Sequence, residues 1–446
     1  MVSVLEKYCD CRAPGATPLV QPVPSKHWRT SRQWHPAVVA LAVLGAAVAG
    51  ARAAGEDAKA SEEDPMTPKT VRRVAPPWDM AVLARPPQVH AAPGFEAEGM
   101  RSLFYEGLPY KGKPTRIFAW YGAPKRPAGE KMPAMVLVHG GGGTAFDDWV
   151  RLWTGRGYAA LSMDTCGCTA GGTHGQRPRH DFGGPPGWGG FDQTADPAAD
   201  QWMYHAVADT ILAVSLIGSF DEVDRDRIGL TGISWGGIVV CIAAGVDPRP
   251  KFVAPVYGCG FLDEPESLAA GFAAGQPEAA AKWLGLWDPR HYLARAKMPM
   301  LWVSGTNDFA FPLPALKKSY RTAPGERVLS VRAPMDHGQE QGAAPEEIRA
   351  MADHLLRGGP PLARVTGQGL DGRAAWATFR AGRPVVKARL EYTCDAGPWQ
   401  PRKWQSVPAD LAAGKVAAAL PQGATAWFFT LTDDAGLVVS TEHVAR

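Results

Sequence analysis

Residues 232–237 read Gly232-Ile233-Ser234-Trp235-Gly236-Gly237, and this stretch decides the fold class. An apolar run at 227–231 precedes it, and an apolar, helix-like segment begins near Ile238. A Gly-x-Ser-x-Gly sequence between a strand and a helix is typical of a nucleophile elbow, in which small flanking residues permit a tight, strained turn that lifts the serine hydroxyl above the sheet. We therefore expect Ser234 to be a nucleophile. The alternative is a glycine-rich turn in a fold that has lost activity.

Short apolar runs and helix-like segments alternate on both sides of this motif, which predicts strands separated by helices. The expected strands are 135–138, 158–163, 227–231, 252–257, 300–304 and 327–331. Three helices are expected. The first has apolar residues at helical spacing: Phe146, Trp149, Val150 and Trp153. The second starts at Asp196-Pro197 and has an apolar face of Met203, Ala206, Val207, Ile211 and Val214, and the third covers 345–356. Such alternation implies a parallel sheet covered on both faces, so we predict a doubly wound, mostly parallel α/β fold.

A boundary is expected at 357–361, Arg-Gly-Gly-Pro-Pro, which follows the last of these helices. Beyond it the period changes to two, because Val386, Ala388, Leu390 and Tyr392 alternate with charged residues. Segments 424–431 and 437–441 flank Thr-Asp-Asp-Ala-Gly, a hairpin signal. We expect a catalytic domain at 100–357 and a small β-sandwich accessory domain at 360–446, which carries no obvious chemistry.

The N-terminal region has the order of a secretory signal. Residues 25–35 are basic, residues 37–50 are uncharged and largely apolar, and Ala51-Arg52-Ala53 offers a cleavage site. The apolar run is shorter than the roughly 20 residues of a membrane span. We expect a signal peptide with an extended n-region at 1–53 and a tether and lead-in at 54–99, hence an exported protein in the periplasm or outside the cell. An uncleaved interfacial helix is the alternative.

Charge and composition exclude several classes of protein. The chain has 446 residues, 46% apolar and 20% charged, which is the composition of a globular protein. Cleavage at 53 would remove six basic and two acidic residues from totals of 47 and 44, leaving 41 and 42. This near-neutral balance indicates no nucleic-acid partner, and no membrane association is expected after cleavage. The oligomeric state stays open.

Five cysteines would remain after cleavage, so at least one is expected to be unpaired or paired between chains. Cys166 and Cys168 are separated by one residue, which is poor geometry for a bond between them. Cys241 lies in an apolar run and is most simply a buried thiol.

A serine nucleophile needs a base, and the base needs a carboxylate to orient it. In this fold the chain order is nucleophile, acid, histidine. Asp308 directly follows the strand 300–304 and His337 follows the strand 327–331, so both lie at carboxyl ends of strands, where open α/β sheets place their sites. We predict a triad of Ser234, Asp308 and His337. The other residues considered are expected to have other roles: His139, His174, His180, His205, His291, His443, Asp164 and Asp336.

Acyl transfer also needs donors for a developing oxyanion. The run His139-Gly-Gly-Gly-Gly-Thr144 follows a buried strand and precedes a helix, so it predicts an oxyanion loop. We expect the backbone N–H groups of Trp235, Gly141 and Gly142 to be the donors. The loop lacks the Gly-Lys-Ser/Thr ending of a phosphate-binding loop.

The segment 171–202 is a long, glycine-rich and aromatic loop, and such loops often form binding walls. We expect Trp188 or Phe191 to contact substrate, where a flat ring stacks on a sugar or acyl chain; packing that anchors the loop is the alternative. His174, His180 and Asp181 are a weak metal-binding pattern, and no metal is predicted.

Together, the loop 139–144, the Ser234 elbow, Asp308 and His337 resemble the α/β-hydrolase superfamily, more narrowly its acetylxylan esterase, dienelactone hydrolase and prolyl-oligopeptidase-like branch. The resemblance covers about residues 100–357. It implies a serine carboxylesterase without metal or organic cofactor that acts on a small-molecule or polysaccharide ester, with acetylated plant polysaccharide the favoured substrate. Dienelactone hydrolases have a cysteine where this chain has Ser234, and the N-terminal propeller usual in prolyl-oligopeptidases does not fit between 54 and 99.

Two further functions stay open in the sequence. A peptidase or lactonase of the same fold has the same triad, because leaving-group choice depends on the pocket. A non-catalytic carbohydrate-binding surface protein is the alternative from another class; against it stands the complete set of Ser234, Asp308, His337 and the glycine loop.

Overall fold

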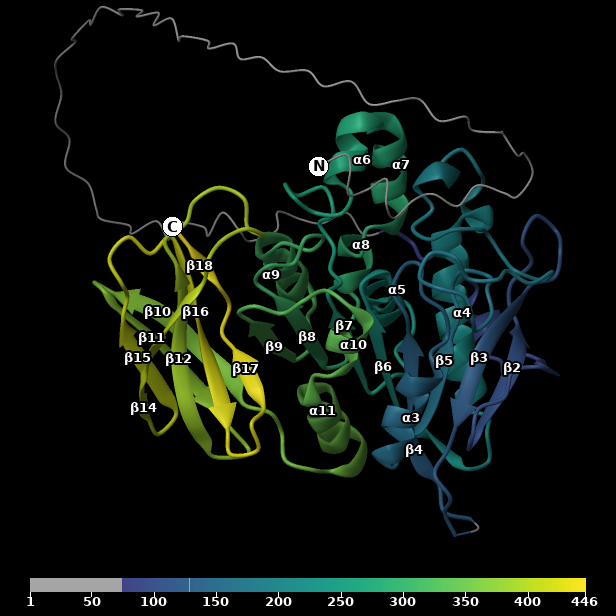
Figure 1. Ribbon diagram of the computed structural model, residues 1–446, viewed down its shortest axis with the longest axis horizontal. Coiled ribbons are helices and arrows are strands. Elements are labelled where there is room, and N and C mark those ends of the chain that lie inside the picture. Colours follow the sequence, from purple (N-terminus) through teal and green to yellow (C-terminus); the bar gives the residue numbers. More distant parts are fainter. Residues whose placement is uncertain (1–73, 128) are drawn as a thin grey trace, which may run out of the picture. The chain divides into compact units, whose positions relative to one another are not determined.

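The computed structural model describes residues 74–446 except residue 128 (Figure 1). The expected signal peptide at 1–53 and the first part of the expected tether lie outside the described residues. Within the described part of the chain, no helix has both the length and the apolar character needed to span a membrane.

The main sheet has nine strands in the order β1-β2-β3-β5-β4-β6-β7-β8-β9. The strands are β1 (Val89–Ala91), β2 (Met100–Glu106), β3 (Arg116–Gly122), β4 (Met132–Val138), β5 (Ala159–Met163), β6 (Val223–Ile233), β7 (Phe252–Val256), β8 (Met300–Gly305) and β9 (Arg327–Arg332). Strands β4 to β9 pair in parallel, whereas β1, β2 and β3 add antiparallel pairs at one edge. The predicted mostly parallel α/β sheet is confirmed, and each predicted strand lies within or beside an observed one.

The helices that connect the parallel strands are α3 (Asp147–Gly155), α4 (Trp202–Ile217), α5 (Trp235–Ala244), α6 (Ala270–Gly275), α7 (Pro277–Trp287), α8 (Arg290–Leu293) and α9 (Leu313–Thr322) (Figure 1). The short helix α2 (Met80–Leu83) precedes β1, and α10 (Gln339–Ala343) and α11 (Glu346–Arg357) follow β9. The chain steps from β4 to β5 in one direction along the sheet and from β5 to β6 in the other. Right-handed crossovers therefore place α3 and α4 on opposite faces. Helices α4 and α5 pack side by side and are almost entirely buried, so the core includes both helices and the sheet.

The second helix begins later than its sequence indicates. A 3₁₀ turn, η2 (Ala198–Asp200), follows Asp196-Pro197, and α4 starts only at Trp202. The backbone of Gln201 is extended, and the N–H of Trp202 donates to the side-chain oxygen of Gln193 at 2.7 Å. Because this N–H binds a side chain, it does not bind a backbone carbonyl of η2, and the 3₁₀ turn does not continue into α4.

Two antiparallel sheets follow α11 and form a β-sandwich. Their orders are β10-β11-β15-β14 and β13-β12-β16-β17, with β18 beside β16. The strands are β10 (Arg364–Asp371), β11 (Ala374–Arg380), β12 (Val385–Thr393), β13 (Gln405–Pro408), β14 (Asp410–Ala412), β15 (Lys415–Ala419), β16 (Ala426–Asp433), β17 (Val438–Ser440) and β18 (Val444–Ala445). Val386 shares the two-residue period of Ala388 and Leu390 but is 60% exposed, because the pairing of β12 with β16 shifts register between Val385 and Lys387.

The sandwich shares part of its core with the large sheet. Phe428, Leu437 and Val439 belong to the same buried cluster as the strands of the main sheet. Polar contacts reinforce this junction: the N–H of Val331 donates to Ser440 Oγ at 3.0 Å, and the N–H of Val438 donates to a carboxylate oxygen of the buried Glu347 at 2.6 Å.

Candidate active site

Ser234 lies at the sharp turn between β6 and α5. Its backbone has φ 58° and ψ −117°, a conformation that non-glycine residues rarely adopt. The turn closes only because its neighbours lack side chains: a Cβ on Gly232 would lie 2.3 Å from the carbonyl oxygen of Gly236, and one on Gly236 would lie 2.1 Å from that of Val138. The sequence thus dictates a strained elbow that holds the serine hydroxyl at the carboxyl edge of the sheet.

His337 joins Ser234 to Asp308. Its Nε2 lies 2.9 Å from Ser234 Oγ, and its Nδ1 lies 2.9 Å from Asp308 Oδ2. The other carboxylate oxygen of Asp308 accepts the N–H groups of Ala310 and Phe311, both at 2.8 Å, which fixes the orientation of this buried side chain. An ionised carboxylate only accepts, so Nδ1 carries the ring proton and the Nε2 lone pair faces the serine hydroxyl. The structure brings the three predicted residues together in the arrangement of a serine with its general base.

The loop after β4 passes directly beside the serine. A Cβ added to Gly140 would lie 3.1 Å from Ser234 Cβ and 3.2 Å from the carbonyl oxygen of Ile233, so a side chain here would press on the nucleophile. The N–H groups of Gly141 and Gly142 donate to no described residue. The N–H of Trp235 is in the first turn of α5, where no intrahelical acceptor exists.

His139 fixes the orientation of this loop. Its Nε2 accepts the N–H of Thr165 at 2.9 Å, so the ring proton is on Nδ1, which donates to the carbonyl oxygen of Gly140 at 2.6 Å. In a trans peptide the C=O and N–H point in opposite directions, so the N–H of Gly141 points away from His139. His174 holds the next carbonyl, that of Gly141, at 3.0 Å.

Three buried groups beneath this loop have the chemistry of metal ligands: His139, Asp164 and Cys166, whose ligand atoms lie within 4.8 Å of one another. Imidazole, carboxylate and thiolate suit zinc. As folded, however, the His139 lone pair binds a backbone N–H, and Asp164 Oδ2 accepts the N–H groups of Cys166 and Cys168, both at 2.8 Å. The cluster therefore supports the loop. Burial raises the pKa of the Cys166 thiol, so this group is a poor thiolate donor.

The two predicted substrate contacts lie in different surroundings. Phe191, in η1 (Phe191–Gln193), packs within an aromatic cluster: its ring centroid is 4.4 Å from that of Phe272, 4.7 Å from Trp283 and 5.6 Å from Trp235. Trp188 is half-buried and lies against the glycine loop, because a Cβ on Gly141 would be 2.6 Å from its Cδ1. Trp188 thus borders the site, whereas Phe191 anchors the loop.

The other histidines and aspartates considered lie apart from the triad. His205 and His291 bind backbone carbonyls through Nε2, and His443 is buried between the sandwich and α9. His180 packs against Phe104, and its burial lowers its pKa. The side chain of Asp336 is exposed, and its backbone carbonyl accepts the hydroxyl of Tyr257 at 2.6 Å. The five described cysteines form no disulfide.

Three rings around His337 were missed from the sequence: Tyr257, Phe309 and Phe311. Phe309 and Phe311 are one and three residues after Asp308, and Tyr257 follows β7 at the carboxyl edge of the sheet. In the sequence, only its position directly after a strand indicates that Tyr257 lies near the site.

Residues 98–264 match the model of the acetyl xylan esterase (AXE1) family. Among solved structures, the chain is similar to an acetyl xylan esterase from Paenibacillus sp., with 24% identity, TM-score 0.49 and coverage of 62% of this chain and 92% of that one. It is similar to acetyl xylan esterase 1 from Thermoanaerobacterium sp., with 22% identity, TM-score 0.48 and coverage of 60% and 88%. It is also similar to an acylaminoacyl peptidase from Pyrococcus horikoshii, with 19% identity, TM-score 0.42 and coverage of 58% and 40%.

Proposed function

We propose that this chain, which has an α/β-hydrolase fold and whose residues 98–264 match the acetyl xylan esterase family, is an exported carboxylic ester hydrolase that removes acetyl or other short acyl groups from carbohydrate. One observation carries the proposed serine mechanism: Nε2 of His337 lies 2.9 Å from Ser234 Oγ while Nδ1 lies 2.9 Å from Asp308 Oδ2. The strained backbone of Ser234 supports the same role, because such strain is concentrated at functional sites.

In the first step, His337 Nε2 takes the proton of Ser234 Oγ as that oxygen attacks the ester carbonyl carbon. The carbonyl π electrons move to oxygen, which is stabilised by the N–H groups of Trp235 and of the glycine loop, Gly141 and Gly142. Collapse of this intermediate breaks the bond to the sugar oxygen, which leaves with the proton from Nε2. The product is an acyl-enzyme on Ser234 and a free sugar hydroxyl.

In the second step, water replaces the sugar. His337 takes a proton from water as its oxygen attacks the acyl carbon, and the same oxyanion donors stabilise the intermediate. Ser234 then leaves with that proton, and acetic acid is released, which loses its remaining proton to solvent. Asp308 stays ionised throughout and stabilises the imidazolium that forms in each step.

Three observations support a carbohydrate ester as substrate. The family match is to acetyl xylan esterases. The chain after residue 53 has 41 basic and 42 acidic residues, which suits a neutral polymer. Trp188 borders the site, and an indole face offers a flat apolar surface for a sugar ring.

The proposal is tested by assaying the purified mature chain, residues 54–446, on 4-nitrophenyl acetate, acetylated xylan and aminoacyl anilides. We expect turnover of the two esters and loss of at least about 10⁴-fold in kcat for Ser234→Ala. Asp308→Ala should lose activity as well, whereas the matched control Asp336→Asn, which keeps the backbone carbonyl, should not. Equal turnover by Ser234→Ala would overturn the mechanism, and turnover of the anilides alone would make the chain a peptidase.

Export is a separate part of the proposal, supported by the order of basic run, apolar run and Ala-x-Ala site in the sequence. Expression of the full chain in a Gram-negative host should give a secreted or periplasmic product. Mass spectrometry of that product should find its N-terminus near Ala54. An intact N-terminus beginning at Met1 would contradict export.

A further inference from the structure

The ring of His337 is enclosed by three aromatic side chains. The centroid of Tyr257 is 4.5 Å away with 24° between the ring planes, that of Phe309 is 4.7 Å away at 47°, and that of Phe311 is 6.1 Å away at 16°. Tyr257 is fully buried and makes the closest, nearly parallel contact. We propose that Tyr257 is a positioning residue that holds the imidazole in the plane joining Ser234 to Asp308 and that stabilises its protonated form. This inference rests on the proposed function, because it assigns His337 as the base.

Tyr257 is fixed at both ends. Its N–H donates to the carbonyl oxygen of Val303 in β8 at 2.9 Å, and its hydroxyl donates to the carbonyl oxygen of Asp336 at 2.6 Å. Asp336 directly precedes His337, so the tyrosine binds the segment that carries the base as well as stacking on its ring. Displacement of the ring would therefore move His337 relative to Ser234.

The backbone of Tyr257 is held in an unfavourable conformation. Its φ is 53°, a value that bulky residues rarely adopt and that persists only where surrounding contacts enforce it. The next residue, Gly258, packs its backbone on the first turn of α5, because a Cβ there would lie 2.3 Å from the carbonyl carbon of Gly237. The loop that carries Tyr257 thus rests directly on the helix that begins at the nucleophile.

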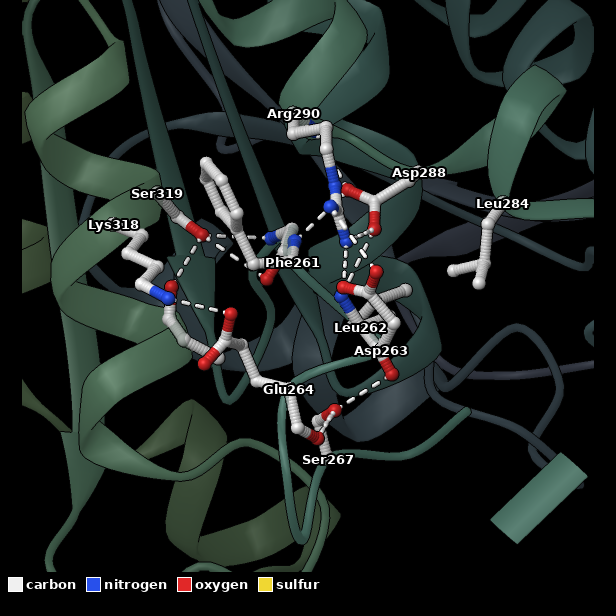
Figure 2. A network of polar contacts seen from close by, with 12 residues as sticks. Phe261, Leu262, Asp263, Glu264, Ser267, Leu284, Asp288, Arg290, Lys318 and Ser319 are labelled. Atoms are coloured by element: carbon white, nitrogen blue, oxygen red, sulfur yellow. Dashed lines mark hydrogen bonds and ion pairs between the residues drawn. The ribbon is translucent and has the colours of Figure 1, made fainter. Parts of the chain in front are cut away.

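A buried polar network holds the other end of this loop (Figure 2). Asp288 accepts the N–H groups of Phe261 and Leu262, both at 2.9 Å, and a guanidinium N–H of Arg290 at 2.7 Å. Ser319 Oγ accepts the N–H of Gly260 at 2.8 Å. Because the loop is fixed from Gly260 to Leu262 and again at Gly258, the strained conformation of Tyr257 is sustained.

Stacking on the base affects the transition state more than the ground state. Before reaction the imidazole is neutral, with its Nε2 lone pair facing Ser234. The proton of Ser234 Oγ moves to Nε2 as the oxygen–carbon bond forms, and the cation that results lies against the electron-rich face of Tyr257. An interaction that strengthens only as charge develops raises kcat and leaves KM nearly unchanged.

The test replaces Tyr257 by phenylalanine and by phenylalanines with one, three and five ring fluorines, which keep the shape of the ring while its face loses electron density. With 4-nitrophenyl acetate, Tyr257→Phe should stay within about fivefold of wild type in kcat, and kcat should then fall stepwise with fluorination by about 30-fold in total. KM should stay within about twofold. A packing role alone would give a flat series, which would overturn the cationic part of the proposal.

The positioning part is tested with Tyr257→Leu, which removes the ring. We expect a drop in kcat of about 100-fold. Tyr292→Leu is the matched control: Tyr292 is another fully buried tyrosine, whose hydroxyl donates to the carbonyl of Leu286, and its loss should lower stability and leave kcat within about threefold. Equal kcat values for the two variants, or a rise in KM in place of the fall in kcat, would overturn the positioning role. If Tyr257→Leu does not fold, Tyr257→Met takes its place, with Tyr292→Met as its control and the same two outcomes.

The two proposals fail in different ways. Failure of the proposed function appears as wild-type protein that hydrolyses no ester, or as activity that survives Ser234→Ala. In that case the rate of Ser234 labelling by a fluorophosphonate, which needs only the serine and its base, becomes the readout for the Tyr257 series. If wild-type protein hydrolyses esters, a flat series overturns only the cationic part of the present inference, and equal kcat values for Tyr257→Leu and Tyr292→Leu overturn its positioning part.

Discussion

Removal of the Asp288 carboxylate is expected to lower the free energy of unfolding by about 4 kcal/mol. The side chain is fully buried and accepts the backbone N–H groups of Phe261 and Leu262 at 2.9 Å and that of Arg290 at 2.8 Å (Figure 2). In Asp288→Ala, three backbone N–H groups lose their acceptor, at roughly 1–3 kcal/mol each and about 3–9 kcal/mol together. The guanidinium of Arg290 also loses one of its two carboxylates, but Arg290 is only partly buried and can bind water, so the value given lies toward the lower end of this range.

A matched control separates this buried carboxylate from an exposed one on the same guanidinium. Asp263 also pairs with Arg290, but its side chain is 45% exposed, so Asp263→Ala should change the free energy of unfolding by less than about 1 kcal/mol. Asp288→Asn keeps one acceptor oxygen and turns an amide N–H₂ toward the remaining donors, so its effect should lie between the two.

Urea unfolding at pH 7, followed by tryptophan fluorescence and far-UV circular dichroism, measures all three variants, and ester turnover is recorded on the folded samples. The order of loss should be Asp288→Ala, then Asp288→Asn, then Asp263→Ala. An Asp288→Ala variant within about 1 kcal/mol of wild type would refute the reasoning, because buried donors would then have found other partners. Equal losses for the two alanine variants would refute it as well.

Three further outcomes follow. Burial, reinforced by nearby cationic side chains, lowers the pKa of His443 from 6.5 to about 3, so between these pH values the unfolded chain binds a proton that the folded chain does not. The free energy of unfolding should therefore fall by roughly 2 kcal/mol between pH 7 and pH 5. Urea titrations of His443→Phe should show that this loss is abolished. Deletion of 360–446 should give insoluble protein, since the sandwich completes the main core; a soluble, active fragment 74–359 would contradict this. Gly140→Ala should lower kcat about 100-fold by pressing on Ser234, while Gly155→Ala, where a Cβ meets nothing within 4 Å, should leave it unchanged.

The parts of the fold and site that could be predicted are those set by local sequence. Ser234 was identifiable because an elbow demands glycines at fixed offsets between a strand and a helix, and these stand side by side in the chain. Asp308 and His337 were identifiable because a parallel sheet brings the carboxyl ends of its strands to one edge. The position of each residue directly after a strand therefore predicted that it lies close to Ser234.

The parts that were missed depend on contacts between segments far apart in sequence. Helix α4 starts later than the sequence predicts because the side chain of Gln193 accepts the N–H of Trp202. Val386 faces outward because of a bulge that only its partner strand defines. Tyr257 is a buried aromatic residue like many others in the chain, and only the packing of β7 beside β8 reveals that its ring stacks on His337.

His139 shows what sequence order conceals about a motif that it identifies. In the chain this residue is only the one before the glycines. In the fold, its Nδ1 proton binds Gly140 because its Nε2 lone pair is taken by the N–H of Thr165, a residue beyond the next strand. The same logic governs His337, where a carboxylate fixes the proton on Nδ1 and leaves Nε2 to Ser234. His139 thereby fixes the peptide that carries the N–H of Gly141, and His337 directs a lone pair toward the hydroxyl of Ser234. The arrangement of donors and acceptors in the site thus depends on two histidine tautomers that neither motif specifies alone.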